Sequence, residues 1–110
     1  MSLGERMVAH LAWSLSEAEK DTAEAKAKCD ALNAKCQKMK DDLYECAVDD
    51  YDRLRLALAR VEGELQHWKS KYDYYLGRQH GIESALIFVQ STVEANERFS
   101  KIVDPWEEIA

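Results

Sequence analysis

The sequence predicts an all-α fold: a single domain built as an antiparallel coiled-coil helical hairpin. Three observations predict it. Ala, Leu, Glu, Lys and Arg dominate the 110 residues, and only four glycines and one proline interrupt them. Apolar residues recur at spacings of three and four along most of the chain, as they do in helices that wind around a partner. This pattern changes phase once, near Val48, where we expect the chain to reverse its direction.

The first helix is predicted over about residues 5–47. Its apolar stripe continues without a gap through Val8, Leu11, Leu15, Ala18, Thr22, Ala25, Cys29, Leu32, Cys36, Met39, Leu43 and Cys46. All three cysteines lie on this stripe, where a thiol behaves as a small apolar side chain. We therefore expect buried free thiols, which suit a reducing compartment.

A turn is predicted at about residues 47–50, and a second helix over about residues 52–103. The stripe of this helix runs through Tyr51, Leu54, Leu58, Val61, Leu65, Trp68, Tyr72, Tyr75, Gln79, Ile82, Leu86, Val89 and Val93. When residues whose numbers add up to 97 face each other, small side chains of the first stripe lie against large ones of the second: Cys29 with Trp68, Ala25 with Tyr72, Thr22 with Tyr75. Close packing favours such a match of sizes. One long rod with a one-residue skip is the alternative, but it leaves the match unexplained.

The second helix contains the segment Gly77–Gly81, with a glycine at each end. The stripe passes through this segment unbroken, so we expect a continuous or gently kinked helix. A break here, giving three helices, is the alternative. Residues 104–110 are predicted to form a short C-terminal tail, because Asp104 followed by Pro105 is typical of a new helix start.

The charged residues predict a binding surface at the turn. The chain has a net charge of -6, and residues 41–52 hold six carboxylates without any Lys or Arg, so the other residues balance to zero. Asp49 or Asp50 is expected to cap the second helix. We call the following set the acidic tip, and predict that it docks on a basic protein partner, with its tyrosine as an amphipathic anchor: Asp41, Asp42, Tyr44, Glu45, Asp49, Asp50 and Asp52. The alternative is a hydrated turn that is kept soluble by its charge.

Apolar residues outside the two stripes predict a second surface, an interface between copies of the chain. The residues of this predicted dimer surface are Met7, Trp13, Phe88, Thr92, Ala95, Phe99 and Ile102. We expect a homodimer in which two hairpins join as a four-helix bundle. In the alternative, a break at Gly77–Gly81 lets the last helix fold back and cover the same stripes within one monomer.

The sequence offers little that predicts catalysis. The segment Glu64–His67 has the Glu-x-x-His spacing of di-iron bundles, but those sites need a second copy and inward-pointing residues. Acidic pairs such as Glu94–Glu97 would suit a divalent-metal phosphohydrolase, yet they lie on separate outer rows. We expect no enzyme, no catalytic residue, no cofactor and no metal, and the phosphohydrolase is the least favoured alternative.

The acidic balance also argues against direct binding to nucleic acid or to an anionic membrane. A few basic and aromatic residues outside the stripe would be the exception: Lys69, Lys71, Tyr74, Arg78 and His80. The longest uncharged runs have ten residues, whereas a membrane span needs roughly 18. We expect a cytoplasmic protein.

Together these features predict a non-catalytic coiled-coil interaction module, an adaptor or an inhibitor. Its partner would be a basic protein surface, for example that of a nucleic-acid-binding protein. The alternative function is that of a structural or assembly component that acts through self-association.

Overall fold

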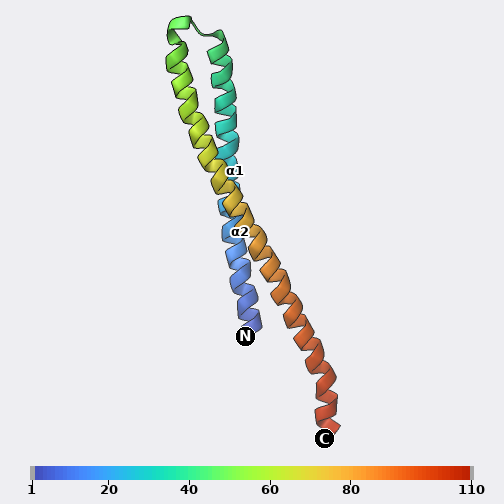
Figure 1. Ribbon diagram of the computed structural model, residues 1–110. Coiled ribbons are helices and arrows are strands. Elements are labelled where there is room, and N and C mark those ends of the chain that lie inside the picture. Colours follow the sequence, from blue (N-terminus) through green and yellow to red (C-terminus); the bar gives the residue numbers. More distant parts are fainter. Residues whose placement is uncertain (1, 110) are drawn as a thin grey trace. The chain divides into compact units, whose positions relative to one another are not determined.

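The computed structural model describes residues 2–109, and their side chains over residues 2–98. Two helices, α1 (Leu3–Glu45) and α2 (Val48–Ile109), are joined by Cys46 and Ala47 (Figure 1). Within residues 2–109, only these two residues and Ser2 lie outside the helices. The predicted all-α hairpin is confirmed, and the single long rod is excluded because the chain turns back at Cys46.

The chain divides into two compact units. Unit 2 comprises Glu19–Gly77 and therefore contains the turn and the hairpin itself. Unit 1 comprises Met1–Ala18 and Arg78–Ala110, and in it the beginning of α1 lies beside the later part of α2.

The core of unit 2 is a thin seam between the two helices. Its buried members are Cys29, Cys36, Leu58, Val61 and Leu65, against which pack the half-buried Leu32, Met39, Leu43, Trp68 and Tyr72. All ten residues belong to the two predicted stripes. Ala25, which the register places opposite Tyr72, is 0% exposed. The smallest side chains are thus the most deeply covered, as expected where they lie beneath bulky ones.

In unit 1 the helices approach closely because one of them carries a glycine. A Cβ atom at Gly4 would lie only 2.7 Å from Cγ2 of Val93. The two residue numbers again add up to 97, so the pairing predicted from the sequence also describes this contact. Any side chain at Gly4 would force Val93 to move, and Val93 is branched at Cβ and therefore stiff.

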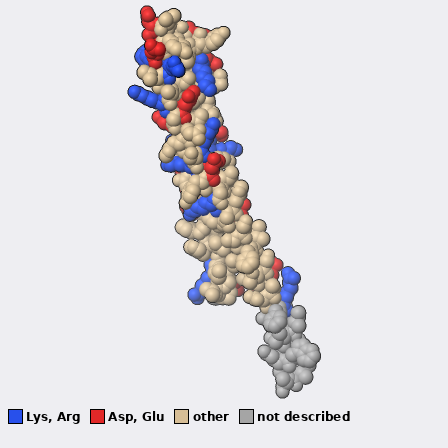
Figure 2. Space-filling view, in the orientation of Figure 1, with Lys and Arg blue, Asp and Glu red and all other residues tan. Residues whose placement is uncertain are grey.

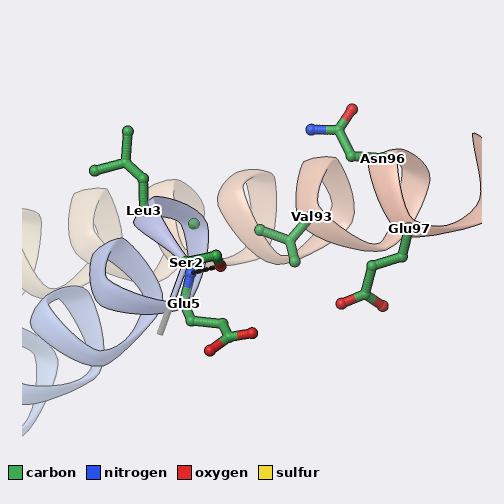
Figure 3. A pocket seen from close by; sticks show the side chains of 7 residues that line it. Ser2, Leu3, Glu5, Val93, Asn96 and Glu97 are labelled. Carbon is green, nitrogen blue, oxygen red and sulfur yellow. Dashed lines mark hydrogen bonds between the residues drawn. The ribbon is translucent and has the colours of Figure 1, made fainter. Parts of the chain in front are cut away.

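Helix α1 begins with a cap that the sequence also encodes. The N–H of Glu5 donates to Oγ of Ser2 (3.1 Å; Figure 3), and the N–H of Arg6 donates to the carbonyl oxygen of Ser2 (3.0 Å). These bonds satisfy N–H groups that have no partner within the helix. The spacing Ser-x-x-Glu is that of a capping box, so Ser2 is a start signal that the periodicity alone does not reveal.

Helix α2 is continuous through Gly77–Gly81, so the three-helix alternative is wrong. A Cβ atom at Gly77 or Gly81 would meet nothing within 4 Å. These glycines lie on the open surface of a regular helix, where they lower its stability without breaking it. The helix also includes residues 104–109, for which the sequence predicts a separate tail.

The turn is shorter than the predicted residues 47–50. Helix α2 already begins at Val48, and the N–H of Asp50 donates to the carbonyl oxygen of Ala47 (3.0 Å). Asp49 and Asp50 therefore lie inside the first turn of α2, and the prediction that one of them caps the helix is wrong. From there they still face the positive end of the helix dipole.

Candidate functional site

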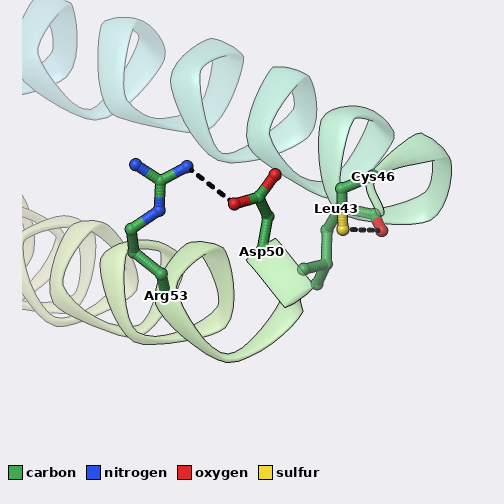
Figure 4. Close-up of polar contacts among 4 residues, drawn as sticks. All are labelled: Leu43, Cys46, Asp50 and Arg53. Atoms are coloured by element: carbon green, nitrogen blue, oxygen red, sulfur yellow. Dashed lines mark hydrogen bonds and ion pairs between the residues drawn. The ribbon is translucent and has the colours of Figure 1, made fainter. Parts of the chain in front are cut away.

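The turn is flanked by one bond from a side chain to the backbone and by one ion pair between side chains. The Sγ–H of Cys46 donates to the carbonyl oxygen of Leu43 (3.2 Å), which lies in the last turn of α1, and Nη2 of Arg53 lies 3.3 Å from Oδ1 of Asp50 in the first turns of α2 (Figure 4). The last carbonyls of a helix have no partner within it, so the thiol takes over part of their hydrogen bonding. A two-residue connection brings the last turn of α1 next to the first turn of α2.

This short connection gathers the acidic tip, although its members come from both helices. Every one of its seven residues is exposed. Asp49 and Asp50 lie in the first turn of α2, where the positive helix end favours them, and Asp52 follows. Asp42 and Glu45 lie in the last turn of α1, which has no basic residue and whose dipole repels them. Two of the six carboxylates of the tip are therefore placed against the local electrostatics.

The tip also exposes apolar surface. Tyr44 is 94% exposed and Val48 is 91% exposed, one on each side of the turn. They line a hollow of about 420 Å³, which we call the tip hollow, together with Leu43, Cys46, Tyr51 and Asp52. Tyr51 belongs to the second predicted stripe but is 44% exposed here. The prediction for this surface named Tyr44 and missed Val48. Val48 is the first residue of α2, and its β-branched side chain is exposed to water.

Basic residues flank the acidic tip rather than fill it. Exposed Arg53 pairs with Asp50, and Nε2 of Gln37 donates to Oδ1 of Asp41 (3.1 Å). On the face shown in Figure 2, carboxylates lie at the turn and basic side chains follow along the helices of unit 2. An exposed i,i+3 pair contributes little, so the tip keeps most of its negative field.

A second candidate surface lies on unit 1. Leu3, Gly4, Met7, Phe88, Val89, Thr92, Val93 and Asn96 line a groove of about 220 Å³, which we call the unit 1 groove. Three members of the predicted dimer surface meet there: Met7, Phe88 and Thr92. Trp13 and Ala95 are exposed but do not line the groove, and the ring of Trp13 stacks on His10 with centroids 6.3 Å apart. The side chains of Phe99 and Ile102 lie outside the described residues.

The other flank of the same helix pair is acidic. Its hollow is lined by Glu5, Val8, Gln90, Val93, Glu94 and Glu97. A third hollow, of about 590 Å³, joins Ser2 and Leu3 to Asn96 and Glu97 near the start of α1 (Figure 3). The three glutamates leave a net negative flank even though Nη2 of Arg98 lies 3.6 Å from Oε2 of Glu94. Unit 1 thus has an uncharged groove on one flank and a carboxylate-lined hollow on the other.

The residues considered for other chemistry are spread over exposed helix faces. Glu64 and His67 are both exposed, and the His67 ring packs edge-on against Trp68. The ring centroid of Trp68 lies 4.7 Å from Nζ of Lys71 and 5.8 Å from Nζ of Lys28. Lysines of both helices therefore lie over the Trp68 ring. Among the side chains that the structure describes, no three His, Cys, Asp or Glu residues are grouped to hold a metal ion.

The cysteines are free thiols: Cys29 and Cys36 are buried and Cys46 is half-buried. In the part of the chain whose side chains the structure describes, neither helix has a stretch long and apolar enough to cross a bilayer.

Comparisons of the chain with models of protein families, with curated proteins and with solved structures gave no significant match.

Proposed function

We propose that this protein is a non-catalytic interaction module whose acidic tip binds a basic segment of another protein. The observation that carries this proposal is the combination of Tyr44, 94% exposed, and Val48, 91% exposed, with six carboxylates around one two-residue turn. Apolar side chains that anchor a contact and charges that steer it are the components of protein recognition surfaces.

The carboxylates in the last turn of α1 support the proposal that the partner is cationic. Asp42 and Glu45 face the negative end of their own helix, and the last turn contains no basic residue. A Lys or Arg of a partner would relieve this repulsion, which the free protein carries uncompensated. Departures from local electrostatic preference in a folded protein concentrate at functional sites.

The tip hollow adds a requirement on the partner. Its lining is apolar except for Asp52 and the hydroxyl groups of Tyr44 and Tyr51. A segment in which an apolar side chain follows basic ones would fill the hollow and reach the carboxylates at once. Proteins that bind nucleic acid hold its phosphates in basic grooves, and such grooves offer basic residues of this kind. If the module covers a groove of this type, it acts as an inhibitor. If it links the basic protein to other proteins, it acts as an adaptor.

Charge reversal at the end of α1 tests the proposal without weakening the fold. Asp42→Lys with Glu45→Lys changes the tip from six negative charges to a balance of four negative and two positive, and places cations where the helix dipole favours them. We expect roughly tenfold or greater weakening of binding to a labelled arginine-rich peptide that contains a leucine, with an unfolding midpoint that is equal or higher. Fluorescence polarisation at low and high salt measures the binding.

The matched control is Glu24→Lys with Asp30→Lys, which reverses two exposed carboxylates of α1 away from the turn. This variant should bind the peptide nearly as well as the original chain does. Replacing the arginines of the peptide by glutamine should abolish binding, and replacing its leucine should weaken it. Equal losses in the two variants would show that net charge rather than the tip attracts the peptide, and would refute the proposal.

A further inference from the structure

The unit 1 groove leaves large apolar side chains in water. Leu3 is 74% exposed, Phe88 is 72% exposed and Met7 is 45% exposed. None of the eight residues that line the groove is charged. On the face shown in Figure 2, unit 1 presents a broad uncharged surface, in contrast to the charged helices of unit 2. Contiguous apolar surface of this kind marks a contact site in soluble proteins.

The later part of α2 does not cover this groove. The helix continues from Phe88 through Asn96 to Ile109 without a break, so its backbone advances along its own axis instead of folding back. The intrachain cover that a break at Gly77–Gly81 would have provided is therefore excluded.

The exposed area is large enough for a dimer. The chain exposes 8544 Å², whereas a compact monomer of 12.6 kDa exposes about 6,200 Å². The excess is about 2,300 Å², and a stable interface needs about 800 Å² from each partner. Burial of about 800 Å² per chain would remove about a third of this excess.

We infer that the unit 1 groove binds the same groove of a second copy in a two-fold symmetric dimer. A two-fold contact brings identical patches together, and an uncharged patch meets its own copy without repulsion. The opposite flank would place Glu5, Glu94 and Glu97 against their own copies, which like charges oppose. Phe88 lines the groove and is 72% exposed, so each copy can pack this ring against the groove of the other. The inference does not depend on what the acidic tip binds.

Phe88→Glu tests the dimer in the full-length chain. Sedimentation equilibrium of the original protein should give the mass of two chains, about twice 12.6 kDa. In the variant the mass should fall to that of one chain, because burying a carboxylate against a second carboxylate opposes pairing. The matched control is Ile87→Glu, since Ile87 is the neighbouring residue and is 64% exposed but does not line the groove. This control should keep the mass of two chains.

Circular dichroism checks that each variant remains helical. If Phe88→Glu loses helicity, Thr92→Lys tests the inference in its place. This substitution should preserve the helix, because Oγ1 of Thr92 donates only to the backbone carbonyl of Phe88 (2.9 Å) and lysine favours a helix more than threonine does. It should likewise give single chains. An original protein with the mass of one chain overturns the inference. So does a dimer that dissociates with Ile87→Glu but persists with Phe88→Glu or Thr92→Lys.

Discussion

Cys46 replaces the glycine that commonly ends an α-helix before a tight turn. Among the described residues none has a positive φ, so the usual left-handed residue is not used here. The thiol of Cys46 instead supplies a donor to Leu43, and the neighbouring Ala47 supplies the first acceptor of α2. A cysteine that the stripe identifies only as an apolar residue therefore also has a role in the geometry of the turn.

Ala25 is the residue at which the fit between the helices can be tested most directly. It is 0% exposed, so Ala25→Leu has no space for the added atoms and should lower the free energy of unfolding by about 1–3 kcal/mol. Urea unfolding followed by circular dichroism measures this change.

The control for this substitution is Ala23→Leu, because Ala23 is exposed on the same helix. A surface substitution of this kind should change the free energy of unfolding by less than about 0.5 kcal/mol. Similar values for the two variants would mean that α1 and α2 do not meet at Ala25 in the register described.

At the scale of the helices, periodicity was sufficient to predict the seam. Every buried residue that the structure describes belongs to one of the two stripes: Ala18, Thr22, Ala25, Cys29, Cys36, Leu58, Val61 and Leu65. The reason is that a two-helix seam has a single geometry, and side chains three and four residues apart must line it. The register followed from matching large side chains with small ones, and continuing the first stripe back from Val8 reaches Gly4 opposite Val93.

The ends of the helices could not be predicted in the same way. The start of α2 at Val48 is accompanied by a hydrogen bond from the N–H of Asp50 to the carbonyl oxygen of Ala47, and the end of α1 by one from the thiol of Cys46 to Leu43. Neither contact leaves a periodic signal in the sequence. The same limit applies to the candidate sites. The sequence identifies which residues of the acidic tip are charged, whereas the hollow beside Tyr44 and the groove beside Phe88 arise from contacts between helices.

The glycines of α2 allow a prediction about the helix as an element. Gly77→Ala should raise the free energy of unfolding by about 0.8–1.0 kcal/mol, because alanine favours the helix and its Cβ would meet nothing within 4 Å. Gly4→Ala should not give this gain, because its Cβ would press on Val93. Chemical unfolding compares the two. A loss of stability in Gly77→Ala would reveal a contact on the outer row of α2 and contradict the open surface described above.

At the scale of the whole molecule, few side chains are shielded from water. Among the described residues no large side chain is less than 2% exposed, and the buried set consists mainly of small and medium-sized residues. Apolar burial is the main source of folding free energy. A chain with such a thin core gains much from any additional apolar contact, which is the role that we infer for the unit 1 groove.

This dependence predicts how stability changes with protein concentration. If folding is coupled to pairing, the thermal midpoint should rise with concentration, since each tenfold increase favours the folded dimer by about 1.4 kcal/mol. Differential scanning calorimetry over a dilution series measures the slope. Ile87→Glu should keep the slope, whereas Phe88→Glu should remove it. A midpoint independent of concentration in the original chain would contradict coupling between folding and pairing.

The residues of the unit 1 groove and those of the acidic tip do not overlap. A dimer that pairs through the groove as we infer would not use tip residues for pairing, and it would carry two acidic tips. A ligand with two linked basic segments would be retained by avidity, since release of one segment leaves it tethered at a high effective concentration. Weak individual contacts at an exposed turn would then be sufficient for durable capture.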